Sequence, residues 1–220
     1  MNQQSSIPSV LVIYGNPKKG GFVHGCLDTI AMELEKSDVQ LRKIHLMDKE
    51  INDCTGCFHC LRTGSCPIED DMDEIMDLMR KADGYVVGAS VRNGFFPALF
   101  KRFYERITYP MGFTRDLKNK YVLGIGAVGM AGGKKVLGNA ITFKEFQTYI
   151  TGYHFFRTRI PTRLTVGDVA PTLREAADSF RLALREKPEL PFMRQLTGKL
   201  DDFVLKQFMF KRTLKTLMTM

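Results

Sequence analysis

The sequence predicts an α/β fold with a doubly wound, five-stranded parallel sheet, and two observations carry this prediction. Short apolar runs rich in β-branched residues alternate along the 220-residue chain with segments of helical spacing. Such alternation is typical of repeated strand–helix–strand units that build a parallel sheet. The chain is also 44% hydrophobic, which suffices for a substantial core and excludes wholesale disorder.

The expected elements follow one another in chain order. The first strand, 9–14, is a continuous apolar run and is therefore expected to be buried on both faces. A glycine-rich loop leads into a helix at 22–37. The second strand, 39–46, alternates in polarity, as an edge strand does. A helix at 70–82 has acidic residues in its first turn and basic residues in its last, which suits the helix dipole. Further strands are expected at 84–90, 120–128 and 153–160, and further helices at 97–107, 136–150 and 171–186.

The chain is expected to form one domain, residues 1–187, followed by a basic amphipathic helical extension, 188–220. Five strands fit the flavodoxin-like order better than a longer dinucleotide-binding fold. Residues 181–220 carry nine Lys/Arg and four Asp/Glu, so they supply +5 of the formal net charge of +8. A basic tail can meet a membrane surface or an acidic partner, but we favour packing against a neighbouring subunit. We expect no nucleic-acid partner.

The N-terminus has neither the basic nor the apolar region of a signal peptide, and no stretch approaches the length of a membrane span. We therefore expect a cytoplasmic protein. In that reducing compartment structural disulfides are rare, and clustered cysteines more often hold a metal or do redox chemistry.

Three loops that follow strands combine unusual residues, and in an open parallel sheet the ligand lies at the carboxyl ends of the strands. The first, 15–21, has the glycines and the lysine Lys18 that suit an anion at a helix N-terminus. The second, 90–96, combines a small hydroxyl, an Asn-Gly pair and two aromatic residues, and the third, 127–135, has glycines that let backbone approach a flat ligand. Each is also typical of an ordinary tight turn. Together they favour a mononucleotide with a single phosphate.

Four of the five cysteines lie in the loop 49–69, as Cys54, Cys57, Cys60 and Cys66. The first three have the C-x2-C-x2-C spacing of a ferredoxin cluster, and the longer x5 segment would have to return Cys66 to the same cluster. A zinc site and free thiols remain as alternatives. Cys26 lies within the first helix and is expected to be a buried hydrophobic residue.

Three motifs resemble those of the NAD(P)H-dependent FMN reductase-like branch of the flavodoxin superfamily, and most closely its iron–sulfur flavoproteins. "GNPKKGG" is similar to the family's G-S-P-R-K-G-G-N-T phosphate loop. "CTGCFHCLRTGSCPIEDDM" is similar to its cysteine segment, and "ADGYVVGASVRNGFFPALFKRFYER" to its second flavin segment. The resemblance covers roughly residues 9–150. It implies three groups of FMN-binding residues: Asn16, Lys18, Gly20, Phe22, Val23 and His24 at the phosphate; Ser90, Val91, Arg92, Asn93 and Gly94 at the isoalloxazine ring; and Ala127, Gly129 and Gly132 at its other edge.

The sequence departs from the family at both flavin loops. Asn16 replaces a serine, Phe22-Val23 replaces a polar pair, and Val91-Arg92-Asn93 replaces Pro-Val-Tyr. A cation at Arg92 would stabilise anionic reduced flavin.

The resemblance implies an FMN-dependent oxidoreductase that passes electrons between NAD(P)H or a redox protein, FMN and a 4Fe–4S cluster. FMN can mediate between a two-electron donor and a one-electron cluster. The alternatives are a cluster-free NAD(P)H:FMN or quinone reductase and a non-catalytic electron-transfer flavoprotein. No catalytic acid or base stands out. A homo-oligomer, dimer or tetramer, is expected because flavodoxin-like reductases commonly complete the flavin pocket from a neighbouring subunit.

Overall fold

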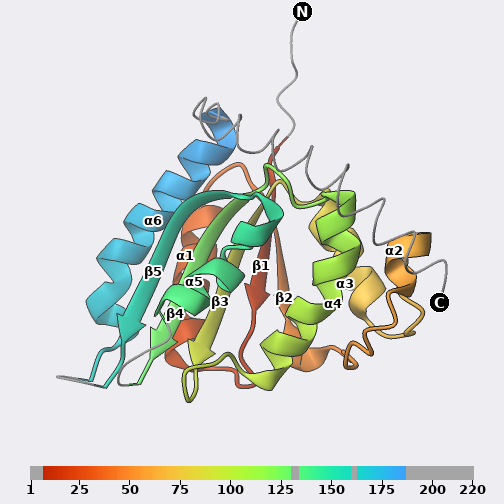
Figure 1. Ribbon diagram of the computed structural model, residues 1–220. Coiled ribbons are helices and arrows are strands. Elements are labelled where there is room, and N and C mark those ends of the chain that lie inside the picture. The colour runs from red at the N-terminus through yellow and green to blue at the C-terminus, as the bar shows by residue number, and fades with distance from the viewer. Residues whose placement is uncertain (1–6, 130–133, 160–162, 187–220) are drawn as a thin grey trace, which may run out of the picture. The chain divides into compact units, whose positions relative to one another are not determined.

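The computed structural model describes residues 7–129, 134–159 and 163–186, whose arrangement Figure 1 shows. A central sheet lies between helices on both of its faces. Its strands are β1 (Ser9–Tyr14), β2 (Gln40–His45), β3 (Gly84–Val91), β4 (Tyr121–Val128) and β5 (Tyr149–Arg157). The α-helices are α1 (Phe22–Glu35), α2 (His59–Thr63), α3 (Met72–Lys81), α4 (Ala98–Thr114), α5 (Lys134–Ile141) and α6 (Val166–Glu186), and short 3-10 helices lie at η1 (Leu46–Asp48) and η2 (Lys144–Phe146).

The five strands are all parallel and lie in the order β2-β1-β3-β4-β5. This confirms the predicted flavodoxin-like, doubly wound sheet. Because the strands share one direction, their carboxyl ends meet at one edge, which is at the bottom of Figure 1. The loops that follow β1, β3 and β4 are thereby brought to the same place. The expected edge strand is also confirmed, since β2 pairs only with β1 and is largely exposed or half-buried.

Successive residues of β1 point to opposite faces of the sheet and so enter two separate cores. Val10 and Val12 pack on one face in a core to which α1 and α6 contribute. Leu11 and Ile13 pack on the other face in a core with residues of α3, α4 and α5. Both cores are closed to solvent, so the residues of β1 are buried on both faces of the sheet. This explains why its sequence is a continuous apolar run. Cys26 is fully buried in the first core, as expected.

The expected helix at 136–150 is wrong in its second half. Helix α5 ends at Ile141, because Phe143 and Gln147 have φ values of 52° and 59° that no α-helix accommodates. The buried Thr148 hydroxyl donates instead to the carbonyl of Thr142 at 2.6 Å. Strand β5 then begins at Tyr149, four residues earlier than the sequence pattern suggests.

Two other helices are longer than expected. Helix α4 continues to Thr114 and includes Pro110, and it ends where Arg115 adopts φ 63°. Helix α6 starts at Val166, where the Thr165 hydroxyl and backbone both donate to Asp168 at its N-terminus. The expected extension, 188–220, lies outside the described residues. None of the helices within the described ranges is long and apolar enough to span a membrane.

Candidate functional site

The loop after β1 is joined directly to the end of β3. The Asn16 side-chain oxygen accepts hydrogen bonds from the Ser90 backbone N–H at 2.8 Å and from the Ser90 hydroxyl at 2.9 Å. Nearby, the Gly15 N–H donates to the carbonyl of Gly88 at 2.8 Å. Residues from two loops 74 positions apart in the chain are thus held in one cluster.

The N-terminus of α1 has the properties of an anion site. Gly21 is its N-cap and makes no side-chain cap, and the first turn contains no acidic residue. The first backbone N–H groups of the helix therefore remain to meet a ligand, and the dipole favours a negative charge there. Gly20, just before the cap, has φ 76°, a conformation that side chains disfavour. Lys18 belongs to the same loop.

The loop after β3 is a tight hairpin. The N–H of Arg92 donates to the carbonyl of Phe95 at 2.8 Å, and the N–H of Phe95 donates back at 3.0 Å. Asn93 and Gly94 between them have φ values of 50° and 81°, as a type I′ turn requires. Phe95 itself is 74% exposed. The Asn-Gly pair is therefore explained by the positive φ angles that this turn requires, and both residues lie at the tip of the hairpin.

A pocket of about 170 Å³ lies where the loops after β1, β3 and β4 meet. It is lined mostly by residues that the sequence suggested, and Gly21, Val128 and Thr158 are additional. Asn93 and Gly94 do not line it, and Gly132 lies outside the described residues. The lining residues are Asn16, Lys18, Gly21, Phe22, Val23, Ser90, Val91, Arg92, Ala127, Val128, Gly129 and Thr158.

A second pocket, of about 850 Å³, adjoins the first and shares Gly21, Phe22 and Thr158 with it. Gly20 and His24 line this larger pocket, together with Arg159 and Arg163. Ligand pockets usually measure about 300–1,000 Å³, so the smaller pocket would accommodate only part of a nucleotide. The suggested phosphate residues therefore divide between two neighbouring pockets.

His24 takes part in a polar and aromatic cluster behind the first loop. Its Nδ1 lies 2.9 Å from Asp28, and Asp28 also accepts a hydrogen bond of 2.7 Å from the Tyr14 hydroxyl. Tyr14 stacks on His45, with ring centroids 4.1 Å apart. Burial, followed by the hydrogen bond with Asp28, raises the pKa of Tyr14, and burial lowers the pKa of His45. His24 is thus fixed by its own helix.

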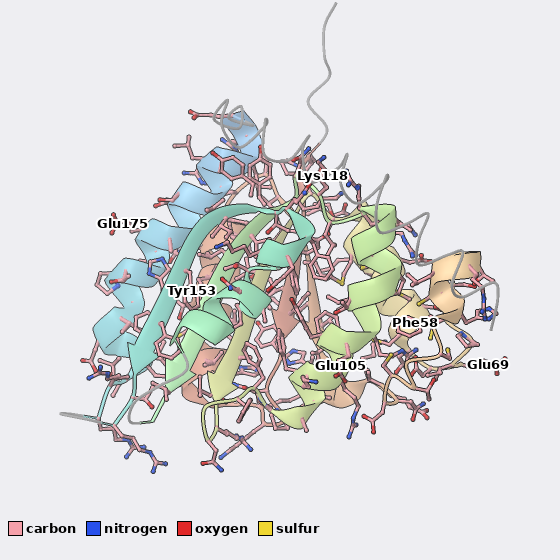
Figure 2. All side chains as sticks on the ribbon, in the orientation of Figure 1. Phe58, Glu69, Glu105, Lys118, Tyr153 and Glu175 are labelled. Carbon is pink, nitrogen blue, oxygen red and sulfur yellow. The ribbon has the colours of Figure 1, made fainter. Side chains whose placement is uncertain are left out.

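All four cysteines of the loop are free thiols. Burial raises the pKa of Cys60, which lies on α2, and the charges of Cys66, Cys54 and Cys57 raise it further. Hydrogen bonds from the His59 backbone and the Thr55 side chain lower the pKa of Cys57. Figure 2 shows sulfur atoms around the labelled Phe58, beside α2.

This donor set fits a metal centre that thiolates bind. Four thiols on one short loop match the ligands of an iron–sulfur cluster and also those of a structural zinc ion. A tetrahedral zinc ion would hold its sulfurs only about 3.8 Å apart, given a Zn–S bond of about 2.3 Å. Within the described ranges, no three His, Cys, Asp or Glu side chains form a group that could hold one metal ion.

Sequence reasoning missed the residues that close the cysteine loop, Arg106 and Asp70. Their side chains form an ion pair with exposures of only 1% and 0%. The available signal was position: Arg106 lies between Phe103 and Ile107 on the buried side of α4. A charged residue on the apolar stripe of a helix is expected only where it has a buried partner.

Comparisons with known proteins agree with this geometry. A family model described as NADPH-dependent FMN reductase matches residues 8–146. An iron-sulfur flavoprotein of Methanocaldococcus jannaschii is 33% identical over 167 residues, covering 74% of this chain and 78% of that protein. Another, of Archaeoglobus fulgidus, is 38% identical over 109 residues, and the match spans 50% of this chain and 49% of that protein.

Among solved structures, an apo NADH:FMN oxidoreductase has a TM-score of 0.56 at 22% identity. The superposition covers 85% of this chain and 94% of that one. At this level of identity the likeness concerns the fold alone.

Proposed function

The chain belongs to the NADPH-dependent FMN reductase family, and on that premise we propose that it is an FMN-dependent oxidoreductase with a second redox centre at its cysteine loop. Electrons would pass between NAD(P)H or a redox protein, FMN and a 4Fe–4S cluster. The observation that carries the proposal is the pocket at the carboxyl edge of the sheet, which combines an anion cradle with two further loops. FMN supplies a group that accepts electrons singly or in pairs.

The first loop would hold the FMN phosphate. Lys18 supplies a cation, and the N-terminus of α1 supplies backbone N–H groups that no side chain caps. Asn16 uses its oxygen to bind Ser90, so its amide nitrogen remains to donate. Phe22 and Val23 line the same pocket without polar groups. Recognition of the phosphate would therefore depend on backbone groups and charge more than on hydroxyl side chains.

The loops after β3 and β4 would hold the isoalloxazine ring. Ser90, Val91 and Arg92 line one part of the pocket, and Ala127 and Gly129 line another. The small residues let the backbone approach a flat ring. The Arg92 guanidinium brings a positive charge to the pocket, which would favour the anionic reduced form of the ring and raise its reduction potential.

Cys54, Cys57, Cys60 and Cys66 would hold the 4Fe–4S cluster. All four are free thiols on one short loop, which supports this assignment because thiolates are the ligands of such a cluster. A cluster of this kind is maintained in a reducing compartment, so we place the protein in the cytoplasm. The electron acceptor would be a small molecule or a redox protein.

Anaerobic purification followed by analysis of flavin, iron and sulfide tests the proposal. We expect about one FMN, four iron and four sulfide per chain. Cofactor released by acid that runs as FAD would contradict the single-phosphate cradle. Flavin without iron or sulfide, combined with consumption of NAD(P)H, would instead identify a cluster-free FMN or quinone reductase. Flavin and cluster without such consumption would identify an electron carrier.

We also propose that the protein is a homo-oligomer, a dimer or tetramer. Phe95, at 74% exposure, extends from the hairpin whose Arg92 lines the pocket. Aromatic residues are enriched at protein–protein interfaces relative to the rest of the surface. Sedimentation at micromolar concentration tests this, and a monomer would contradict it.

A further inference from the structure

The buried ion pair between Arg106 and Asp70 lies at the base of the cysteine loop. The two guanidinium nitrogens of Arg106 donate to the two carboxylate oxygens of Asp70, at 2.5 Å and 3.0 Å. Arg106 is on α4, and Asp70 is the residue that precedes the capping residue of α3. Both side chains are fully enclosed, so solvent does not weaken the attraction.

The same pair binds both ends of the loop. Arg106 donates to the carbonyl of Asn52 at 3.0 Å, before the first cysteine, and to the carbonyl of Ile68 at 3.4 Å, after the last. Asp70 accepts from the N–H of Asn52 at 2.9 Å and from that of Met72 at 3.0 Å. The loop therefore leaves and rejoins the fold at one buried pair.

The charge of Arg106 also reaches a cysteine. Cys66 lies two residues before Ile68, whose carbonyl accepts from Arg106, and its side chain is within hydrogen-bonding reach of the guanidinium. Burying an ion pair seldom adds net stability over apolar residues of the same size. Fold stability alone thus gives no reason for an arginine here, whereas a negatively charged centre next to Cys66 does.

We propose that Arg106 is a positioning residue for the metal centre of the cysteine loop: it holds both loop ends together and places a fixed positive charge beside Cys66. This inference rests on the function proposed above. The reduction potential of an iron–sulfur cluster depends on local charge and on hydrogen bonds to its sulfurs. A cation at this position favours the reduced cluster, and a closed loop base keeps the four thiolates in place.

Two variants separate the two roles. Arg106→Lys keeps the charge but cannot reproduce the forked contacts, so we expect faster loss of iron with a reduction potential close to that of the wild type. Arg106→Gln combined with Asp70→Asn removes both charges without leaving either one buried alone. We expect this double variant to lose iron as well and to have a lower reduction potential. Replacing groups that orient metal ligands typically weakens metal binding about 10- to 100-fold.

The matched control is Arg80→Gln, which removes a half-exposed arginine paired with Asp77 and Asp116, away from the loop. It should retain iron and potential. The rate at which a thiol reagent alkylates the iron-free protein gives a readout independent of activity, and it should rise in both Arg106 variants but not in Arg80→Gln.

The outcomes are distinguishable from those of the proposed function. If wild type holds iron and sulfide and the Arg106 variants match it in iron retention, potential and alkylation, the role of Arg106 is wrong and the proposed function stands. A wild type without iron and sulfide overturns both. Unchanged potential in the double variant, with iron lost, would reduce Arg106 to a purely structural clasp and overturn the electrostatic part.

Discussion

Gly15 stands where the end of β1 meets β3 and α4. A Cβ atom on Gly15 would lie 2.4 Å from the ring of Phe100 and 2.9 Å from the carbonyl oxygen of Gly88. Since its φ is not positive, the requirement for glycine comes from close approach and not from backbone conformation. The first residue of the loop after β1 is therefore fixed by its packing against Phe100 and β3.

Gly15→Ala should lower the free energy of unfolding by about 1–3 kcal/mol, because the added methyl group must displace Phe100 or the β3 backbone. Gly167→Ala is the control: its Cβ would meet nothing closer than 3.7 Å, and alanine has a higher helix propensity than glycine in the first turn of α6. Denaturant unfolding measures both variants. Equal stability of Gly15→Ala and the wild type would contradict the close packing.

His45 makes the stability of the fold depend on pH. Burial, followed by the charges of His24 and Lys19, lowers its pKa in the fold. The unfolded chain, with a histidine pKa of about 6.5, then binds a proton at a pH where the folded protein does not. Stability is therefore fully present above about pH 6.5 and falls as the pH drops towards the folded pKa.

His45→Gln should flatten this dependence without abolishing it, because burial also lowers the pKa of His154. The measurement is the denaturation midpoint at about pH 7.5 and about pH 5.5, on either side of the unfolded pKa. A variant whose midpoint falls as steeply as that of the wild type would show that His45 does not carry the effect.

At the scale of elements, Asn16 joins the loop after β1 to the end of β3. Asn16→Asp should keep both hydrogen bonds from Ser90, since a carboxylate oxygen still accepts them. Its negative charge would, however, repel the phosphate of FMN. We expect little change in stability and weaker binding of FMN, measured by quenching of flavin fluorescence. Riboflavin, which has no phosphate, should bind about equally to both proteins. A parallel loss for riboflavin would contradict the placement of the phosphate.

The cysteine loop and the pocket are built from different elements. Loss of the metal centre should therefore leave FMN binding intact. Cys57→Ala is expected to abolish the cluster and leave FMN bound. Cys26→Ala, on the buried side of α1, is the control and should keep its iron. The measurement is the iron and flavin content of each variant after anaerobic purification. Full iron content in Cys57→Ala would refute the assignment of Cys57 as a ligand.

The sequence predicts elements well wherever one local pattern dominates. The apolar run of β1, the turn glycines and the dipole-matched charges of α3 all place their elements within two residues. The helix predicted for the segment 142–148 does not form, because Phe143 and Gln147 adopt left-handed conformations that tertiary packing imposes. The Arg106–Asp70 ion pair could not be predicted for a related reason. Its two charged residues are 36 positions apart in the sequence and meet only in the folded chain.

At the scale of the whole molecule, most of the net positive charge lies in the C-terminal segment, residues 181–220. We therefore expect this segment to take part in oligomer formation. Residues 196–220 combine apolar residues near helical spacing, such as Leu200, Phe203 and Leu217, with lysines and arginines. Deleting them should shift the oligomer to smaller species in sedimentation and speed the loss of FMN. If the truncated protein keeps its mass and flavin but no longer pellets with anionic vesicles that bound the full chain, a membrane role is indicated instead.

The two ends of the cysteine loop lie next to each other. This arrangement affects how readily the loop can be replaced by another segment. Glu50 and Asp71 exchange backbone and side-chain hydrogen bonds at 2.7 Å and 3.0 Å, next to the contacts that Asn52 and Asp70 make. A segment whose ends already touch imposes little on what lies between them. The stretch 53–69 therefore has the geometry of an interchangeable insertion. A short linker could replace it and leave the sheet intact, and the same junction could receive a loop with another metal preference.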